Sequence, residues 1–204
     1  MSPEWTTATL RAAIARIADR MEECRSELNE RDGQLGDGDL GVTLANGFSN
    51  LRGVAADLPD DVGMALMSCA QALTRSGGSS YSTLLATGLM AAAKETRGKQ
   101  STAWAEIPDL LAIALEKMAA RGKSALGEKT VLDAVEAARA GAVAGGSDPV
   151  AMAREAKVAV AEAIERFRNQ PCRQGRARIF AEKSKGLDDP GMVAFQRIIE
   201  AVAE

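Results

Sequence analysis

The stretch from Leu10 to Leu28 reads LRAAIARIADRMEECRSEL. Its apolar residues recur at steps of three, four and seven, a spacing that places them along one face of an α-helix. They are Leu10, Ile14, Ile17, Met21 and Leu28. The spacing predicts one long amphipathic helix that ends near Asn29.

The remainder of the chain repeats this helical spacing in segments that are joined mostly by short loops. No segment shows the sustained alternation of apolar and polar residues that is typical of a strand. Aromatic residues make up only 3% of the 204 positions and alanine is abundant, a composition that favours closely packed helices over sheets. We therefore expect an all-α protein of about eight antiparallel amphipathic helices, with residues 1–204 forming a single domain.

Two segments interrupt the predicted helices. The run 141–148 reads GAVAGGSD, and its adjacent glycines predict a linker. Residues 169–188 are rich in Pro, Gly and Arg, and a loop of this length is usually mobile or functional. The last helix is expected to follow it at Asp189-Pro190, an acidic N-cap and a proline in the first turn.

Composition excludes several classes of protein. With 25 Lys and Arg against 28 Asp and Glu, the net charge of −3 argues against a nucleic-acid partner. No apolar run approaches the roughly 20 residues that cross a bilayer, and charges occupy the start of the chain, where a signal peptide is apolar. We therefore expect a cytoplasmic protein with no membrane contact. The three cysteines form no CxxC pair, which argues against a disulfide framework and a zinc site.

The chain contains no histidine. This excludes Ser-His-Asp and Cys-His catalysis, histidine-ligated zinc, and acid–base catalysis by an imidazole of this chain. Any catalysis here must use carboxylates, hydroxyls, Lys, Arg, backbone amides or a metal ion.

The segment 32–41 reads DGQLGDGDLG and contains three carboxylates and four glycines. Carboxylates this close repel one another unless a cation lies between them, and Mg²⁺ prefers such oxygen ligands. The glycines allow the backbone to turn tightly enough for Asp32, Asp37 and Asp39 to converge. We therefore interpret these three residues as metal ligands in a glycine-rich loop between two helices.

Three other interpretations of this segment are a dinucleotide fingerprint, an EF-hand loop and a solvated acidic turn. Gly36-x-Gly38-x-x-Gly41 matches a dinucleotide fingerprint, but no strand precedes it and two of its intervening residues are acidic. An EF-hand loop that starts at Asp37 fails, because Phe48 stands where the final Glu is needed. A solvated acidic turn without a ligand remains open on residue type alone.

Two further clusters precede predicted helices. Residues 76–80 read SGGSS, and hydroxyls and amides before a helix N-terminus are suited to binding phosphate. Residues 127–130 read GEKT, where Thr130 is also an ordinary helix cap. Arg176 and Arg178 in the long loop could neutralise a phosphoryl group or form a solvated basic surface. Each cluster alone is a weak signal.

Taken in order along the chain, these motifs resemble the nucleotide-binding subunit of dihydroxyacetone kinase. Four motifs carry the resemblance: Asp32 with the DGD triplet 37–39 and Gly41, the GGSS turn 77–80, the GEKTVLD segment 127–133, and the segment from Gly175-Arg176 to Gly191. The resemblance extends from about Leu10 to Val202. It implies a closed helical barrel that binds ADP or ATP with two Mg²⁺ ions at one end.

The resemblance also implies a role for each matching residue. Asp32, Asp37 and Asp39 would ligate the two Mg²⁺ ions and, with Arg176, serve the catalytic chemistry. The predicted nucleotide contacts comprise Leu40, Gly41, Thr43, Ser79, Ser80, Gly122, Thr130, Val131, Arg176, Asp189, Pro190 and Gly191. Phosphoryl transfer needs mainly positioning and charge neutralisation, which these residues could provide.

The chain departs from the family pattern at two places near the expected chemistry. Leu40 stands directly after the Asp-Gly-Asp triplet, where the family usually has His. Tyr81-Ser82-Thr83 follows Ser80, where the family tends to continue Gly-Pro-Leu. These changes indicate a divergent branch that acts on another small keto-sugar, or a paralogue with weakened activity.

The resemblance implies partners as well. In the family a separate subunit or domain holds the ketose through a histidine, which this chain lacks, so we expect a substrate-binding partner subunit. The phosphoryl donor is either exchanging ATP or a phosphotransferase-system protein that rephosphorylates bound ADP, and a homodimer is left open. Two alternatives are a non-catalytic regulator that binds nucleotide and a protein partner, and a helical scaffold without a ligand.

Overall fold

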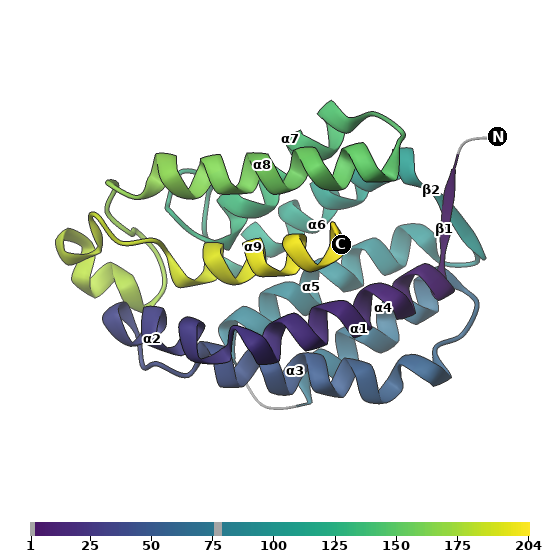
Figure 1. Ribbon diagram of the computed structural model, residues 1–204, viewed down its shortest axis with the longest axis horizontal. Helices are drawn as coiled ribbons and strands as arrows, with labels where there is room; N and C mark the ends of the chain where they lie inside the picture. The colour runs from purple at the N-terminus through teal and green to yellow at the C-terminus, as the bar shows by residue number, and fades with distance from the viewer. Residues whose placement is uncertain (1–2, 76–78) are drawn as a thin grey trace.

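Long helices dominate the structure, a computed structural model that describes residues 3–75 and 79–204 except for the side chains of residues 176, 177 and 180 (Figure 1). The α-helices are α1 (Thr7–Glu23), α2 (Arg25–Leu35), α3 (Leu40–Val54), α4 (Val62–Thr74), α5 (Ser80–Thr96), α6 (Ile107–Gly122), α7 (Val131–Gly145), α8 (Pro149–Phe167) and α9 (Pro190–Val202). The 3-10 helices are η1 (Ala55–Asp57), η2 (Trp104–Glu106) and η3 (Arg176–Ser184), and the strands are β1 (Glu4–Thr6) and β2 (Ser101–Ala103). The expected all-α class is confirmed.

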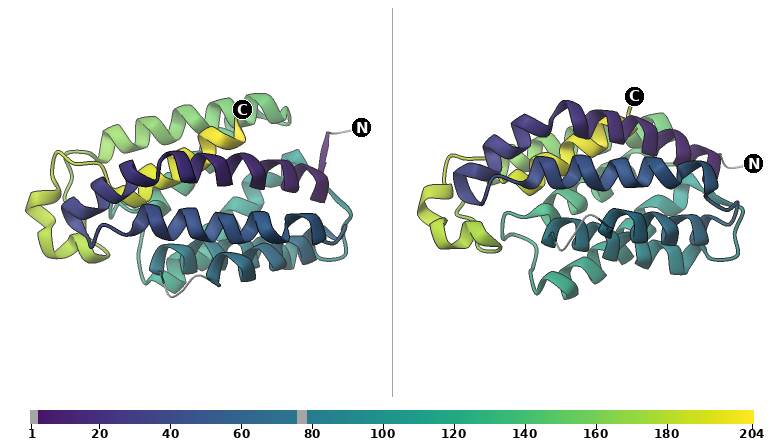
Figure 2. Two further views of the ribbon diagram at one scale, coloured as in Figure 1. Left: turned by 60° about the horizontal axis from the view of Figure 1, so that its bottom comes forward. Right: turned by 90° about the horizontal axis from the view of Figure 1, so that it is seen from below.

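Eight of the helices pack side by side in a closed order. Contacts run from α1 to α3, then through α4, α5, α6, α7, α8 and α9 and back to α1, and α7 also contacts α9. Figure 2 shows that the helices run along the long direction of the molecule. The order agrees with the barrel that the resemblance implies. The apolar faces meet in one main core, where Met21, Leu44 and Val160 are completely buried.

The two ends of the bundle differ. Helix α2, the connection to α3 and the segment that contains η3 lie at one end, whereas β1, β2 and the N-terminus lie at the other (Figure 1). The strands pair antiparallel, with Trp5 opposite Thr102. The expectation that the chain contains no strands is therefore wrong for β1 and β2. A strand of three residues is too short to show a sustained alternation of apolar and polar side chains. Among the described residues, no helix is long and apolar enough to span a bilayer.

The structure corrects two expected boundaries. The predicted first helix divides at Cys24 into α1 and α2, although Leu28 remains fully buried beyond the break. The predicted linker 141–148 is mostly helical, because α7 continues to Gly145. A Cβ atom on Gly141 would lie 2.5 Å from the carbonyl oxygen of Glu155, so this glycine permits close packing of α7 on α8. The chain turns only at Gly146, whose φ is +72°.

Several helix starts follow from local sequence. The carboxylate of Asp189 accepts a hydrogen bond from the amide of Met192 at 2.8 Å, and Pro190 occupies the first turn of α9. The expected start of the last helix is thereby confirmed. Asp148 caps α8 in the same way, ahead of Pro149. Such caps satisfy amides that have no partner within the helix.

Candidate nucleotide and metal site

Three carboxylates converge at the end of the bundle that carries α2. Asp32 lies within the last turns of α2, not in a loop as expected, and Asp37 and Asp39 lie in the connection to α3. One oxygen atom from each of the three side chains lies within 4.8 Å of the other two. The structure therefore brings together the three predicted metal ligands, which are half-buried or exposed.

Asp32 shapes the turn that carries the other two carboxylates. Its Oδ2 atom accepts hydrogen bonds from the amides of Gly38 at 2.9 Å and Asp39 at 3.1 Å. Gly38 has a φ of +76°, a conformation that costs little only for glycine. A Cβ atom on Gly36 would lie 2.5 Å from Oδ1 of Asp32. The spacing of acids and glycines in the sequence is therefore required by this fold of the turn.

Helix α3 begins directly after this turn and lies tightly against α2. A Cβ atom on Gly41 would overlap the carbonyl oxygen of Arg25. The side-chain oxygen of Asn29 accepts a hydrogen bond from the amide of Val42 at 3.1 Å. Leu40 is buried in the main core, and Thr43 is half-buried in the first turn. Any nucleotide contact at residues 40–43 must therefore come from the start of α3.

The donor set of the acidic cluster fits a hard divalent cation. Carboxylate oxygens are the ligands that Mg²⁺ prefers, and Mg²⁺ usually completes its octahedron with water and phosphate rather than with protein groups. Three convergent carboxylates, two of them exposed, provide such a partial shell. Without a cation their charges repel one another.

Helix α5 begins at the same end with the predicted phosphate turn. Ser79 is its N-cap and half-buried, and Ser80 is its exposed first residue. The carbonyl oxygen of Ser79 accepts hydrogen bonds from the amide and the hydroxyl of Thr83 at 3.0 and 2.8 Å. Residues 76–78 of the predicted turn lie outside the described residues.

The segment that precedes α7 is held by Asp133, which is buried. Its carboxylate accepts hydrogen bonds from the amides of Gly127 at 2.6 Å and Thr130 at 2.9 Å. Thr130 caps α7, because its hydroxyl oxygen accepts a hydrogen bond from the amide of Leu132, as expected of an ordinary cap. Val131, the next residue, is buried. Gly122 ends α6 and is exposed.

Lys129 is a residue of this site to which the sequence analysis assigned no role. Only 1% of its surface is exposed, and its φ of +62° is rare for a residue with a side chain. Its Nζ atom donates hydrogen bonds to the carbonyl oxygens of Arg168, Gln170 and Ser184 at 2.9, 2.8 and 2.8 Å. The ammonium group therefore holds both ends of the predicted long loop. Burial lowers the pKa of Lys129.

The second half of the predicted long loop contains a 3-10 helix. Residues 176–184 form η3, and the amide of Cys172 donates to the hydroxyl of Ser184 at 2.7 Å. Gln174 donates to the carbonyl oxygen of Lys123 at 2.9 Å, which places the loop beside the end of α6. The side chain of Arg176 lies outside the described residues.

The predicted nucleotide turn at Asp189, Pro190 and Gly191 lies against the first turn of α5. The hydroxyl of Tyr81 donates to the carbonyl oxygen of Gly191 at 3.0 Å. A Cβ atom on Gly191 would lie 3.2 Å from the Tyr81 ring. Burial raises the pKa of the Asp189 carboxyl to about 7. Hydrogen bonds from backbone amides and the charge of Lys129 lower this pKa, but burial has the larger effect. Tyr81, which we noted only as a departure, is thus a contact between two predicted nucleotide segments.

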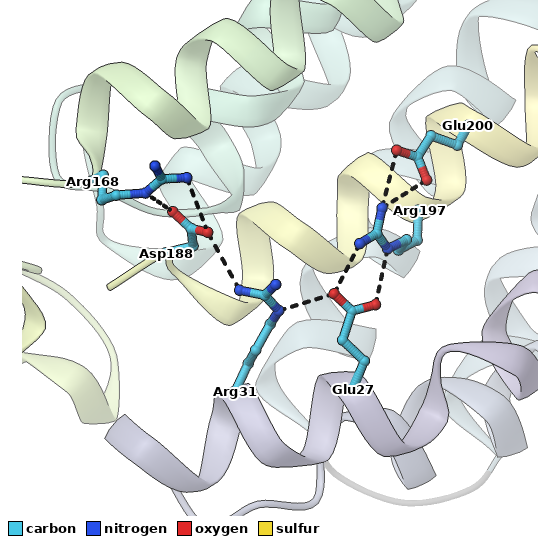
Figure 3. Close-up of polar contacts among 6 residues, drawn as sticks. All are labelled: Glu27, Arg31, Arg168, Asp188, Arg197 and Glu200. Atoms are coloured by element: carbon cyan, nitrogen blue, oxygen red, sulfur yellow. Dashed lines mark hydrogen bonds and ion pairs between the residues drawn. The ribbon is translucent and has the colours of Figure 1, made fainter. Parts of the chain in front are cut away.

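Ion pairs join this turn to the helix that carries Asp32. Asp188 lies between two cations, with Arg31 of α2 at 3.3 Å and Arg168 at 2.7 Å (Figure 3). Glu27 of α2 pairs with Arg31 at 3.0 Å and with Arg197 of α9 at 2.8 Å. The acidic cluster and the predicted nucleotide turn therefore belong to one connected end of the molecule.

Comparison with known proteins identifies the family. The DAK2 domain matches residues 34–204 of the chain, which is most of its length. The chain belongs to the DAK2 domain family. The match begins after Asp32 and includes Asp37 and Asp39. The expected family resemblance is thereby confirmed.

Relatives of this DAK2 domain are named as kinases or kinase subunits. The chain is 28% identical over 195 residues to the PEP-dependent dihydroxyacetone kinase, ADP-binding subunit DhaL, of Escherichia coli, covering 93% of this chain and 92% of the relative. It is 27% identical to a subunit of the same name from Listeria innocua, covering 92% and 91%. Human triokinase/FMN cyclase is 29% identical, covering 94% of this chain and 34% of that protein.

A solved structure shares the fold of this DAK2 domain. The crystal structure of the dihydroxyacetone kinase from C. freundii in complex with AMP-PNP and Mg²⁺ matches with a TM-score of 0.77 at 21% identity. The match covers all of this chain and 35% of the other, so this chain spans about a third of that protein. At this identity the likeness establishes the helical fold alone.

Proposed function

We propose that the chain is the ADP- and ATP-binding subunit of a dihydroxyacetone-type kinase, which supports Mg²⁺-dependent phosphoryl transfer to a small ketose. The observation that carries the proposal is the convergence of Asp32, Asp37 and Asp39 beside the start of α3. An ion pair connects this end of α2 to the proposed nucleotide turn. The names of the DhaL relatives, which the chain matches over most of both lengths, support the same function.

In the proposed site, Asp32, Asp37 and Asp39 hold two Mg²⁺ ions, which neutralise the charge of the nucleotide phosphates when bound. The first turns of α3 and α5 both begin here, and helix N-termini favour bound anions. Gly41, Thr43, Ser79 and Ser80 would therefore contact the phosphates from two sides. Arg176 would add a positive charge from the loop.

The base and ribose would lie between the ends of three other helices. Gly122 ends α6, Thr130 and Val131 begin α7, and the turn 189–191 begins α9. Lys129, which precedes α7, holds the loop that leads to this turn, and Tyr81 holds the turn against the start of α5. Neither hydrogen bond needs a nucleotide. Such preorganisation lowers the entropic cost of binding.

The reaction transfers the γ-phosphoryl group to a hydroxyl oxygen of the ketose. The bond between the γ-phosphorus and the oxygen that bridges it to the β-phosphate breaks, and a bond from the γ-phosphorus to the hydroxyl oxygen forms. ADP is the leaving group, and the hydroxyl proton passes to water. Because the chain has no histidine, a separate substrate-binding subunit would hold dihydroxyacetone or a related ketose. The donor would be either ATP or a phosphotransferase-system protein that rephosphorylates bound ADP.

The test is calorimetric titration of ADP in the presence of Mg²⁺. Replacing Asp37 with Ala should weaken ADP binding by at least about tenfold, since loss even of groups behind the metal ligands costs this much. Asp57→Ala removes the same charge from η1, at the opposite end of α3, and should leave the affinity unchanged. Equal ADP affinity of the Asp37→Ala variant and the wild type would contradict the assignment.

A further inference from the structure

An ion pair connects the two halves of the proposed site directly. Arg31 precedes the metal ligand Asp32, and Asp188 precedes the nucleotide residue Asp189. The Nη1 atom of Arg31 lies 3.3 Å from Oδ2 of Asp188, across 157 positions of sequence. Each member of the pair is thus one peptide bond from a residue with a proposed ligand.

We propose that the Arg31–Asp188 pair couples the metal cluster to the nucleotide turn, so that Mg²⁺ and nucleotide strengthen each other's binding through the protein. The inference rests on the proposed function, because it assigns ligands to the two segments. Arg31 and Asp188 are positioning residues in this account. They touch neither ligand, and they act through Asp32 and Asp189.

The surroundings of Asp188 show that it is held rather than solvated. Only 15% of its side chain is exposed. Its Oδ1 atom lies 2.7 Å from Nε of Arg168, at the end of α8. The carbonyl oxygen of that same Arg168 accepts hydrogen bonds from Lys129 and from the amide of Gly186. Because the Asp188 carboxylate is fixed between two guanidinium groups, it can transmit a displacement of α2 to the turn 189–191, which follows Asp188.

The acidic cluster supplies the reason for such a displacement. Without a cation, Asp32, Asp37 and Asp39 repel one another, and a bound Mg²⁺ draws their oxygens together. Asp32 lies in the last turns of α2, so its movement shifts the same segment that carries Arg31. Coupling of this kind is reciprocal, and the nucleotide must therefore raise the affinity for Mg²⁺ by the same factor.

Direct contact between Mg²⁺ and phosphate would also couple the two ligands, so the protein's share must be isolated by mutation. Arg197 provides a matched control. It joins α9 to α2 by pairing with Glu27 at 2.8 Å, which also pairs with Arg31 (Figure 3). Arg197→Gln thus removes a guanidinium group that, like that of Arg31, pairs with Glu27. Arg197 joins α2 to α9 itself, whereas Arg31 joins α2 to Asp188 in the connection before α9. Unlike Arg31, Arg197 is adjacent to no proposed ligand.

The experiment measures the ADP dissociation constant by calorimetry with saturating Mg²⁺ and with EDTA. The ratio of the constant with EDTA to the constant with Mg²⁺ reports how strongly Mg²⁺ favours ADP binding. Arg31→Gln and Asp188→Asn should each lower this ratio by about fivefold, the lower end of typical coupling between sites. The double variant should lower it no further, and Arg31→Lys should recover part of it. Arg197→Gln should keep the wild-type ratio although it lowers the melting temperature.

The outcomes separate the inference from the proposed function. If the wild-type protein binds ADP more tightly with Mg²⁺ and both single variants keep its ratio, the coupling is wrong and the proposed function stands. If Arg197→Gln lowers the ratio as much as Arg31→Gln does, general loosening of α2 explains the effect and the inference fails. If the wild-type protein binds no ADP with Mg²⁺ present, both fail. Should Asp188→Asn fold poorly, the comparison of Arg31→Gln with Arg31→Lys decides.

Discussion

The hydroxyl group of Tyr81 donates a hydrogen bond to the carbonyl oxygen of Gly191, 110 positions later in the chain, at 3.0 Å. This contact fixes the start of α9 against the start of α5, and both starts carry proposed nucleotide contacts. Burial and the nearby Asp189 raise the pKa of Tyr81 well above its usual value. The hydroxyl is a donor at neutral pH even without this shift. The departure from the family pattern at this position therefore has a structural role.

Replacing Tyr81 with Phe should weaken ADP binding several-fold and lower the free energy of unfolding by about 1 kcal/mol, because one hydrogen bond is lost. Calorimetry and urea unfolding measure the two effects. Thr87→Val removes a hydroxyl that bonds within α5 one turn beyond Thr83. It should cost stability without changing ADP affinity. Unchanged ADP affinity in Tyr81→Phe would show that the contact does not shape the nucleotide turn.

Replacing Lys129 with Met should lower the free energy of unfolding by about 3 kcal/mol, because three carbonyl oxygens lose their donor in a buried place. Trypsin should then cleave the segment 169–186 faster, because this segment contains several Arg and Lys residues after which trypsin cuts. Lys157→Met, at an exposed position of α8, is the control. Equal cleavage rates in Lys129→Met and the wild type would contradict the anchoring role of the ammonium group.

Asp189 should make stability depend on pH. Burial raises its pKa from 3.8 to about 7, so between these pH values the folded protein holds a proton that the unfolded chain releases. The contribution of this group to the free energy of unfolding is therefore complete below about pH 4 and is lost as the pH rises to 7, a change of about 4 kcal/mol. Asp189→Asn should flatten the curve of unfolding free energy against pH. Parallel curves for the two proteins would contradict the shift.

Gly41→Ala should destabilise the fold by about 3 kcal/mol, because the added methyl group meets the backbone of Arg25 and α3 must move away from α2. The same movement should displace Asp39 and weaken ADP binding with Mg²⁺. Gly53 lies near the other end of α3 with no atom within 4 Å of an added Cβ. Gly53→Ala should therefore stabilise the protein by about 0.5 to 1 kcal/mol. Thermal unfolding compares the two variants.

The helical class and the acidic cluster were predictable because both depend on local sequence. The apolar period from Leu10 onward reports one buried face, and the glycines around Asp37 report a turn that only small residues can adopt. The interpretation of Gly141 as part of a linker was wrong. The absence of a side chain at Gly141 lets α7 contact Glu155 on α8, and local sequence does not distinguish a glycine at a close helix contact from a glycine in a turn.

Long-range contacts could not be predicted from local sequence. The GEKT motif marks residues 127–130 as a candidate site. The neighbouring sequence does not show that Lys129 donates hydrogen bonds to carbonyl oxygens about 40 to 55 positions later. The pairing of Arg31 with Asp188 is likewise invisible in a chain with 53 charged residues, 25 basic and 28 acidic. A fully buried lysine can be recognised only when the fold has placed its partners.

The central claim is that Mg²⁺ and nucleotide bind together at the acidic cluster. Thermal melting of the wild-type protein alone, with Mg²⁺, with ADP and with both tests it most directly. At 100 times the dissociation constant a ligand adds about 2.7 kcal/mol, so the melting temperature should rise by roughly 5 to 10 °C when both are present and much less with either one. The same melting temperature in all four conditions would contradict the account.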